Sequence, residues 1–245
     1  MARERYLLDE TEDTIHQNQI VPTTASDKRK NWWFYHKTHT IVALIVVVFV
    51  VVIVHSFVTR ETPDYTIAIM TEYSLPNDLL QDIEEHLERY ADDRNGDGET
   101  VVSLQYYHFS SNTTSDYEAA ELQASFVKFA ADASSGDSII FIYDDESYRY
   151  LDNNDMSDFF GPIEEGGEDY ILLKDMAGLN NLTLNHYAED GNIETVMNVI
   201  GNLKVSVRTE EGTAFDKEEK VEYREDCIEM YKRLRDDVPV NTAAK

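Results

Sequence analysis

The longest hydrophobic run in the chain is Ile41–Val54, fourteen consecutive apolar residues of which eight are valine. The surrounding segment 40–58 contains no formally charged residue. At 1.5 Å rise per residue, such a helix is roughly 28 Å long, close to the hydrocarbon thickness of a bilayer. A soluble helix normally shows a polar face, and this run has none. The pattern therefore predicts one transmembrane helix over residues 40–58.

The residues on either side of this run predict its orientation. Three consecutive cations, Lys28, Arg29 and Lys30, precede it, and only Arg60 follows closely. The positive-inside rule then predicts a single-pass protein of the cell membrane, with a cytoplasmic tail over 1–39 and everything after a 59–64 linker extracytoplasmic. The alternative is a cleaved signal peptide, but HSFVTRET after Val54 contains no small-x-small cleavage site.

After the linker, strand and helix patterns alternate. Strands are predicted at 65–71, 100–109 and 138–143, and the two connecting segments carry helical stripes of apolar residues. Ser115 and Glu118 match a capping box at the start of the second helix. The first and third strands are apolar on both faces, whereas the second has polar positions typical of a sheet edge. We therefore predict an α/β fold with a β-α-β-α-β start and the strand order 2-1-3.

The second half of the outer domain, which we place at 65–237, is less regular. Residues 146–152 indicate a short helix, 193–199 fit a helix or a strand, and 203–209 alternate as a strand does. Phe159–Pro162 predicts a turn with aromatic anchors. A final helix is predicted from Asp216, its N-cap, to Asp237, with a buried side of Val221, Ile228, Tyr231 and Leu234. Residues 238–245 are predicted to be a flexible tail.

Charge and cysteine content exclude several classes of function. Residues 60–245 carry fifteen Lys or Arg and forty-two Asp or Glu, so the whole net charge of −27 lies there. Such a domain repels phosphate backbones, which excludes nucleic acid as a partner, and it tolerates cationic or neutral ligands. The single cysteine, Cys227, can form neither an internal disulfide nor a zinc cluster, and its helical context predicts a small buried side chain.

The segment 65–143 resembles the first lobe of extracellular solute-binding proteins of bacterial ABC transporters. The resemblance rests on a strand, the stretch LPNDLLQDIEEHLERYADDRNGDGETVVSLQYY, a helix and GDSIIFIYDD. The chain is similar to small membrane-anchored proteins of Gram-positive bacteria, especially clostridia, that have no assigned activity. The resemblance implies one solute-binding-like lobe and a transporter as partner. It carries over no functional residue.

One loop has the pattern of a cation site. Asp93, Asn95 and Asp97, with Gly98 and then Glu99, match the first half of a D-x-N-x-D-G calcium loop, in which alternate oxygens surround the ion. The twelfth position, where a bidentate acid belongs, is Leu104. The alternative is a plain turn that ends the preceding helix. Calcium at Asp93, Asn95, Asp97 and Glu99 is therefore one of two open interpretations, and no other cofactor is predicted.

A second candidate site follows from topology. In open α/β sheets, ligands bind beyond the carboxyl ends of strands, where the strand order reverses. With the order 2-1-3, these ends bring Glu72, Tyr73 and Ser74 next to Asp144 and Asp145. Two tyrosine-flanked acidic segments could bind a sugar or a cation. The alternative interpretation is that these residues are ordinary loop residues and helix caps.

Standard catalytic signatures are missing from the sequence, which contains no G-x-S-x-G, H-E-x-x-H, C-x-x-C or G-x-G-x-x-G motif. We therefore predict a non-enzymatic, membrane-anchored, solute-binding-like domain that is an ABC-transporter accessory or a ligand sensor. The alternative is a structural or interaction module of the cell envelope without a small-molecule ligand. A third, weaker alternative is a hydrolase with acidic catalytic residues.

Overall fold

The computed structural model describes residues 24–58, 62–110, 114–153, 159–163, 167–187 and 192–240. The chain divides into two compact units, residues 1–60 and residues 61–245. In the first unit, the described part is a single helix, α1 (Ala25–Val58). Its apolar segment is long enough to cross a membrane or to act as a signal sequence, and none of it is buried against protein.

Helix α1 ends at Val58, where the predicted transmembrane helix ends, but it begins well before residue 40. Its start has a local cause, because the Thr24 hydroxyl accepts a hydrogen bond from the Asp27 backbone N–H at 3.2 Å, as an N-cap does. The part of the predicted cytoplasmic tail from Ala25 onward is therefore helical and continuous with the apolar segment. Residues 1–23 of the tail, linker residues 59–61 and residues 241–245 lie outside the described residues.

In the second unit, a mixed sheet begins with the predicted strand arrangement. Strands β1 (Tyr65–Thr71), β2 (Val102–His108) and β3 (Ser138–Tyr143) lie in the order β2-β1-β3, and both neighbouring pairs are parallel. The order 2-1-3 and the edge position of β2 are thus confirmed. Strands β1 and β3 are central because their Ile, Phe and Met side chains are buried on both faces of the sheet.

Beyond β3 the sheet continues with antiparallel strands. Strand β6 (Lys204–Arg208) pairs with β3, and its other edge pairs with two short strands, β4 (Phe160–Gly161) and β5 (Ile171–Leu172). The predicted strand at 203–209 is confirmed. The predicted turn at Phe159–Pro162 is partly wrong, because Phe160 pairs with Arg208 in the sheet.

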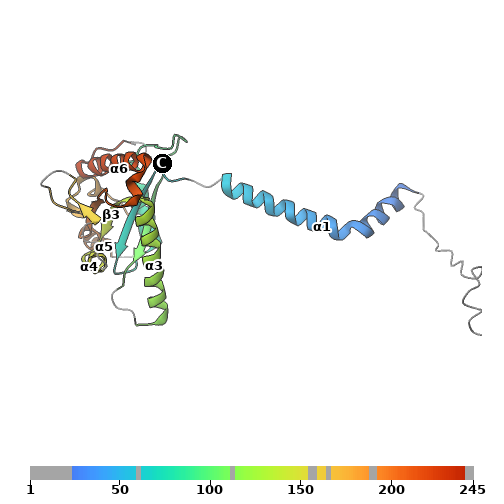
Figure 1. The fold of residues 1–245 in the computed structure, drawn as a ribbon, viewed down its shortest axis with the longest axis horizontal. Helices are drawn as coiled ribbons and strands as arrows, with labels where there is room; N and C mark the ends of the chain where they lie inside the picture. The colour runs from blue at the N-terminus through green and yellow to red at the C-terminus, as the bar shows by residue number, and fades with distance from the viewer. Residues whose placement is uncertain are drawn as a thin grey trace, which may run out of the picture. The chain divides into compact units, whose positions relative to one another are not determined.

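Helices cover both faces of this sheet (Figure 1). Helices α2 (Asn77–Leu87) and α6 (Glu218–Asp236) contribute to one core cluster, whereas α3 (Asp116–Ser135) and α4 (Asp145–Asp152) border the other. The topology explains this split. The chain moves outward from β1 to β2 and then back past β1 to β3, so two right-handed crossovers place α2 and α3 on opposite faces.

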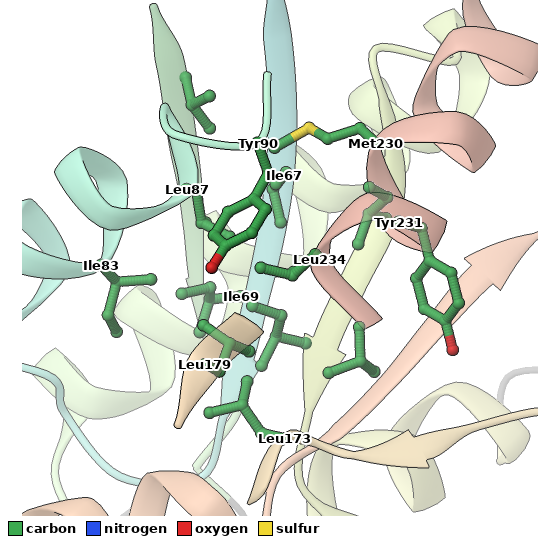
Figure 2. Packing of buried hydrophobic residues seen from close by; sticks show 14 of the residues in the cluster. Ile67, Ile69, Ile83, Leu87, Tyr90, Leu173, Leu179, Met230, Tyr231 and Leu234 are labelled. Carbon is green, nitrogen blue, oxygen red and sulfur yellow. The ribbon is translucent and has the colours of Figure 1, made fainter. Parts of the chain in front are cut away.

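The larger core cluster lies under α2 and α6. Side chains of α2 (Leu87), the 3-10 helix η4 (Ala177–Leu179) and α6 (Leu234) converge on Ile67 and Ile69 of β1 (Figure 2). Each such side chain, when fully buried, contributes about 1.5–3 kcal/mol through the hydrophobic effect. Cys227 of α6 is buried in this cluster as predicted, and burial raises the pKa of its thiol to about 12.

The opposite core cluster is aromatic. Phe129 is the one apolar residue of α3 that is fully buried, and it contacts the rings of Tyr107 and Phe141 edge-on. The Arg208 guanidinium, which is also buried, lies 4.7 Å from the ring centroid of Phe159. Its Nε and Nη1 have no hydrogen-bond partner among the described residues, so burial lowers the pKa of Arg208 and aromatic faces stabilise its charge.

The helices also refine the sequence predictions. The capping box of Ser115 and Glu118 is confirmed, and so is the short helix α4. The ambiguous segment 193–199 is a helix, α5 (Ile193–Gly201). The predicted N-cap of α6 is wrong, because Lys217 holds that position while Asp216 ends a 3-10 turn. The buried face of α6 is rotated from the predicted one and consists of Tyr223, Cys227, Met230, Tyr231 and Leu234.

Candidate functional site

The carboxyl ends of β1 and β3 bring together the residues that the topology predicts for a ligand site. Strands β1 and β3 are adjacent and parallel, so the segments that follow them meet at one edge. The Glu72 backbone N–H donates a hydrogen bond to Asp144 Oδ2 at 2.7 Å, which joins the two segments directly. The predicted juxtaposition of Glu72 and Asp144 is therefore present in the structure.

Asp144 is occupied by the fold itself. It is the N-cap of α4, where its Oδ1 accepts a hydrogen bond from the Ser147 backbone N–H at 2.7 Å. Its other oxygen, Oδ2, is the acceptor for Glu72. One carboxylate thus satisfies a helix end and an unpaired strand-end amide, two groups that lack partners in regular secondary structure. Both oxygens have a structural role before any ligand is considered.

Tyr73 and its surroundings form a second closed network at this edge. The Tyr73 carbonyl accepts hydrogen bonds from the Tyr106 hydroxyl at 2.8 Å and from the Thr71 hydroxyl at 2.6 Å. The Tyr106 oxygen in turn accepts from the Leu75 backbone N–H at 3.2 Å. Burial, followed by the nearby Asp144 charge, raises the pKa of Tyr73 to about 12, so this phenol is neutral at pH 7.

The two remaining predicted residues at this edge behave differently. The Asp145 carboxylate pairs with Lys204 Nζ at 2.6 Å. Ser74 is exposed to solvent. The carboxyl edge therefore consists mainly of helix caps and internal hydrogen bonds, which corresponds to the alternative interpretation of these residues.

The predicted calcium loop is also hydrogen-bonded internally. The two oxygens of Asp93 accept from the backbone N–H groups of Gly96 and Gly98, at 2.7 and 2.9 Å. Asn95 and Asp97 each accept from an N–H two residues onward, at 2.8 and 2.9 Å. Both glycines have positive φ angles of 75° and 90°, which L side chains rarely adopt.

Asp64, a residue outside the calcium pattern, ties this loop to the sheet. Its Oδ1 accepts from the backbone N–H groups of Arg94 and Asn95, both at 2.9 Å, and its Oδ2 accepts from Val101 at 3.0 Å. No group of three or more His, Cys, Asp or Glu side chains that could hold a metal occurs in the part of the chain that the structure describes. Calcium binding by Asp93, Asn95, Asp97 and Glu99 stays a prediction.

An open cleft of about 700 Å³ lies at the other end of the sheet. It runs between the last turns of α3 and the first turns of α6, beside the start of β1, and its lining includes Asp64, Tyr107, Lys128, Lys220 and Tyr223. Its volume is in the range of small-molecule sites. We refer to it below as the amino-end cleft.

Most acids in the amino-end cleft are already paired. Asp132 accepts from the Tyr107 hydroxyl at 2.6 Å and from the Ser138 backbone N–H at 2.7 Å. Asp137 pairs with Lys220 Nζ at 2.8 Å. Burial pushes the pKa of Asp137 up, but the hydrogen bonds from Lys220 and Ser135 outweigh it and hold this pKa below its ordinary value.

Cations line the amino-end cleft although the domain is strongly acidic. Arg94, Lys128 and Lys220 all contribute to its wall. The Arg94 guanidinium lies 4.9 Å from the Tyr223 ring centroid and pairs with Asp226, and Lys128 Nζ lies 5.4 Å from the Tyr107 centroid. Among the described residues, Lys128 has no carboxylate partner, and besides the Tyr107 ring its Nζ makes a long 3.5 Å contact to the Tyr106 carbonyl.

A third cluster, on α2, joins two segments that are distant in sequence. The buried Asp82 carboxylate accepts hydrogen bonds from the backbone N–H groups of Asn185, His186 and Tyr187 and from His186 Nδ1 at 2.8 Å. Burial raises the pKa of Asp82, but these donors outweigh it and leave the pKa lowered. The hydrogen bond that His186 donates to Asp82 raises the pKa of His186. The cluster fixes a loop onto α2.

Comparison with known proteins finds no matching family model, no matching curated protein and no matching solved structure. The likeness to solute-binding proteins therefore stays a prediction. Sequence reasoning did not identify Asp64, Asp82 or the amino-end cleft. One signal was present for the cleft, because Lys128 is the only basic residue of α3 in a domain with few cations. Its neighbours in the cleft come from other elements.

Proposed function

We propose that this chain is a single-pass membrane protein that binds a small zwitterionic ligand in the amino-end cleft of a non-catalytic, extracytoplasmic domain. The observation that carries this proposal is the cleft of about 700 Å³, whose lining combines three cations and two tyrosines with four acids. The anchor is supported by α1, whose apolar segment has no protein cover. Exposing so many valines to water is unfavourable, whereas a bilayer removes that cost.

The orientation of the anchor is supported by the charges next to it. Lys28, Arg29 and Lys30 precede the apolar segment, which favours a cytoplasmic amino terminus. Protease added to intact cells tests this topology. A carboxyl-terminal tag should be digested while an amino-terminal tag is protected, and the chain should stay in the membrane fraction after alkaline extraction. A protected carboxyl-terminal tag would contradict the orientation.

The ligand class follows from Lys128 and Glu219, charged side chains of the cleft for which neither an ion pair nor a short hydrogen bond occurs among the described residues. Lys128 of α3 and Glu219 of α6 come from helices on the two sides of the cleft. A ligand that carries both a carboxylate and an ammonium group, such as an amino acid, fits one charge at each side. An anchored domain that binds such a solute is suited to deliver it to an ABC transporter in the same membrane, the partner we propose.

A thermal-shift screen of the full chain in micelles tests the ligand. At a ligand concentration about one hundred times Kd, binding stabilises the folded state by about 2.7 kcal/mol, so a zwitterionic amino acid should raise Tm by several degrees. Lys128→Gln and Glu219→Gln should each reduce this shift. Lys232→Gln and Glu225→Gln, at exposed positions of α6, are matched controls that should keep it. Equal shifts in all four variants would place the ligand elsewhere.

A second candidate function is a structural module that pairs with another copy of itself through α3. This helix exposes 77% of Tyr117 and 61% of Val127. Alanines continue the same stripe at helical spacing, at positions 120, 124 and 131. An antiparallel second copy would place Lys128 against Glu121 of the other chain. Sedimentation of the full chain in micelles tests this, since Val127→Glu should convert a dimer into a monomer.

A further inference from the structure

The first part of α1 differs from the rest of that helix in its chemistry. Residues 25–39, which we call the amino-terminal arm, contain four cations and one acid. Four consecutive aromatic residues, 32–35, follow the first three cations, and each exposes half or more of its surface. Aromatic residues of this kind concentrate at the interface between lipid and water, whereas cations are excluded from the hydrocarbon.

A bend separates the arm from the valine-rich segment of α1 (Figure 1). Two side chains at the carboxyl-terminal end of the arm donate to carbonyls one turn earlier. His36 Nδ1 lies 3.1 Å from the Trp32 carbonyl oxygen, and the Thr40 hydroxyl donates to the His36 carbonyl at 2.9 Å. Side chains that bond the backbone in this way bend helices. The arm therefore need not continue along the axis of the apolar segment.

We propose that the amino-terminal arm binds the anionic lipid headgroups of the cytoplasmic leaflet. This inference rests on the proposed anchor, because membrane insertion keeps the arm beside the bilayer. Lys28, Arg29, Lys30 and Lys37 supply the attraction, at about 1 kcal/mol for each cation near an anionic surface. The aromatic residues Trp32 and Trp33 supply interfacial contact. A soluble polyanion is the weaker partner, since only the membrane is held next to the arm by the chain itself.

The protein carries its own reporter for a test. Its only two tryptophans are Trp32 and Trp33, so all tryptophan emission comes from the arm. The full chain is reconstituted into vesicles of phosphatidylcholine alone and into vesicles with one part in three phosphatidylglycerol. Emission is recorded at low and high salt, with and without a lipid that carries a quencher close to its headgroup.

Anionic vesicles should shift the emission to shorter wavelength and increase quenching by the shallow quencher, and high salt should reverse both effects. Each cation replaced by glutamine should weaken docking about fivefold. The quadruple variant Lys28→Gln, Arg29→Gln, Lys30→Gln and Lys37→Gln should give identical emission in both lipids. The control variant Lys217→Gln with Lys232→Gln, in the outer domain, should behave like the parent chain.

Three results would overturn the proposal, and flotation of the vesicles distinguishes the first two from each other. If the chain floats with both kinds of vesicle but its emission and quenching are the same in each, the lipid headgroup is not the partner and the anchor stands. If the chain floats with neither, the anchor fails as well. Soluble polyglutamate is added to the chain in neutral vesicles as a further comparison. If it shields the tryptophans as much as anionic vesicles do, the arm recognises any polyanion.

Discussion

The two ends of the central sheet differ in how their polar groups are used. At the carboxyl edge, both oxygens of Asp144 and the hydroxyl of Tyr106 bond to groups of the fold. At the amino end, the cleft contains paired acids but also Lys128 and Glu219, for which no ionic partner occurs among the described residues. Acidic and aromatic residues gathered at a topological switch point can serve the fold rather than a ligand. Charged side chains that have no ionic partner within the fold are then the better guide to a ligand site.

Removing the Asp144 carboxylate should have the largest effect on stability. A small effect would contradict the structural role that we assign to Asp144 at the carboxyl edge. Asp144→Ala removes the N-cap of α4 and leaves the Glu72 N–H without its acceptor. We expect a loss of about 2–4 kcal/mol in the free energy of unfolding. Urea unfolding of the full chain in micelles measures it. Asp144→Ser should recover part of the loss, and Glu219→Ala, at the amino end, should cost about 0.5 kcal/mol or less.

The Tyr106 hydroxyl should matter less but still measurably. Tyr106→Phe removes the donor to the Tyr73 carbonyl and the acceptor of the Leu75 N–H. The expected cost is about 1–2 kcal/mol, because the backbone groups can partly turn to water at this half-exposed edge. Tyr117→Phe is the matched control, since Tyr117 is exposed on α3. An equal effect of both substitutions would contradict the closed network.

The ion pair of Asp137 and Lys220 gives the amino end a pH signature. The pKa of Asp137 is lower in the folded protein, so the pair stabilises the fold above the unfolded pKa, about 3.9. That stabilisation is lost as pH falls through the lower folded pKa. Because Asp137 is exposed, the contribution at pH 7 is about 0.2–1 kcal/mol. Unfolding titrations should show Asp137→Asn less stable than the parent at pH 7 and equal to it at the lowest pH, and a constant difference would exclude the ion pair.

Lys128 should separate binding from stability. Because Lys128 has no carboxylate partner among the described residues, Lys128→Gln should change the free energy of unfolding by about 0.5 kcal/mol or less without ligand. The same variant should lose most of the stabilisation by a zwitterionic ligand. Paired unfolding curves with and without ligand measure both quantities. A large loss of stability without ligand would place Lys128 among the structural residues.

Calcium should have the smallest effect. If the loop of Asp93, Asn95, Asp97 and Glu99 binds calcium with a Kd of about 1 mM, then an equal calcium concentration stabilises the fold by about 0.4 kcal/mol. Calorimetry of the full chain measures the heat directly, and Asp93→Asn is the variant to compare. No heat at millimolar calcium would favour the plain turn, whose carboxylates accept backbone N–H groups instead.

The elements were more predictable from sequence than the sites. Strands β1 and β3 follow from runs that are apolar on both faces, and α3 follows from its capping box, because these signals are local. Predictions failed where a tertiary contact determined the local structure. Phe160 joins the sheet because Arg208 pairs with it, and the helix α6 turns Tyr223 and Met230 inward because β1 and η4 lie beneath it.

By itself, the sequence determined that one valine-rich helix needs an apolar environment and that an acidic α/β domain with strand order 2-1-3 follows it. Periodicity and hydrophobic length are properties of contiguous residues, so they can be read along the chain. Only the tertiary structure decided which charges are used by the fold. Asp144 meets Glu72, Asp82 meets His186, and Lys128 meets no acid within the part of the chain that the structure describes, because each outcome depends on segments far apart in sequence.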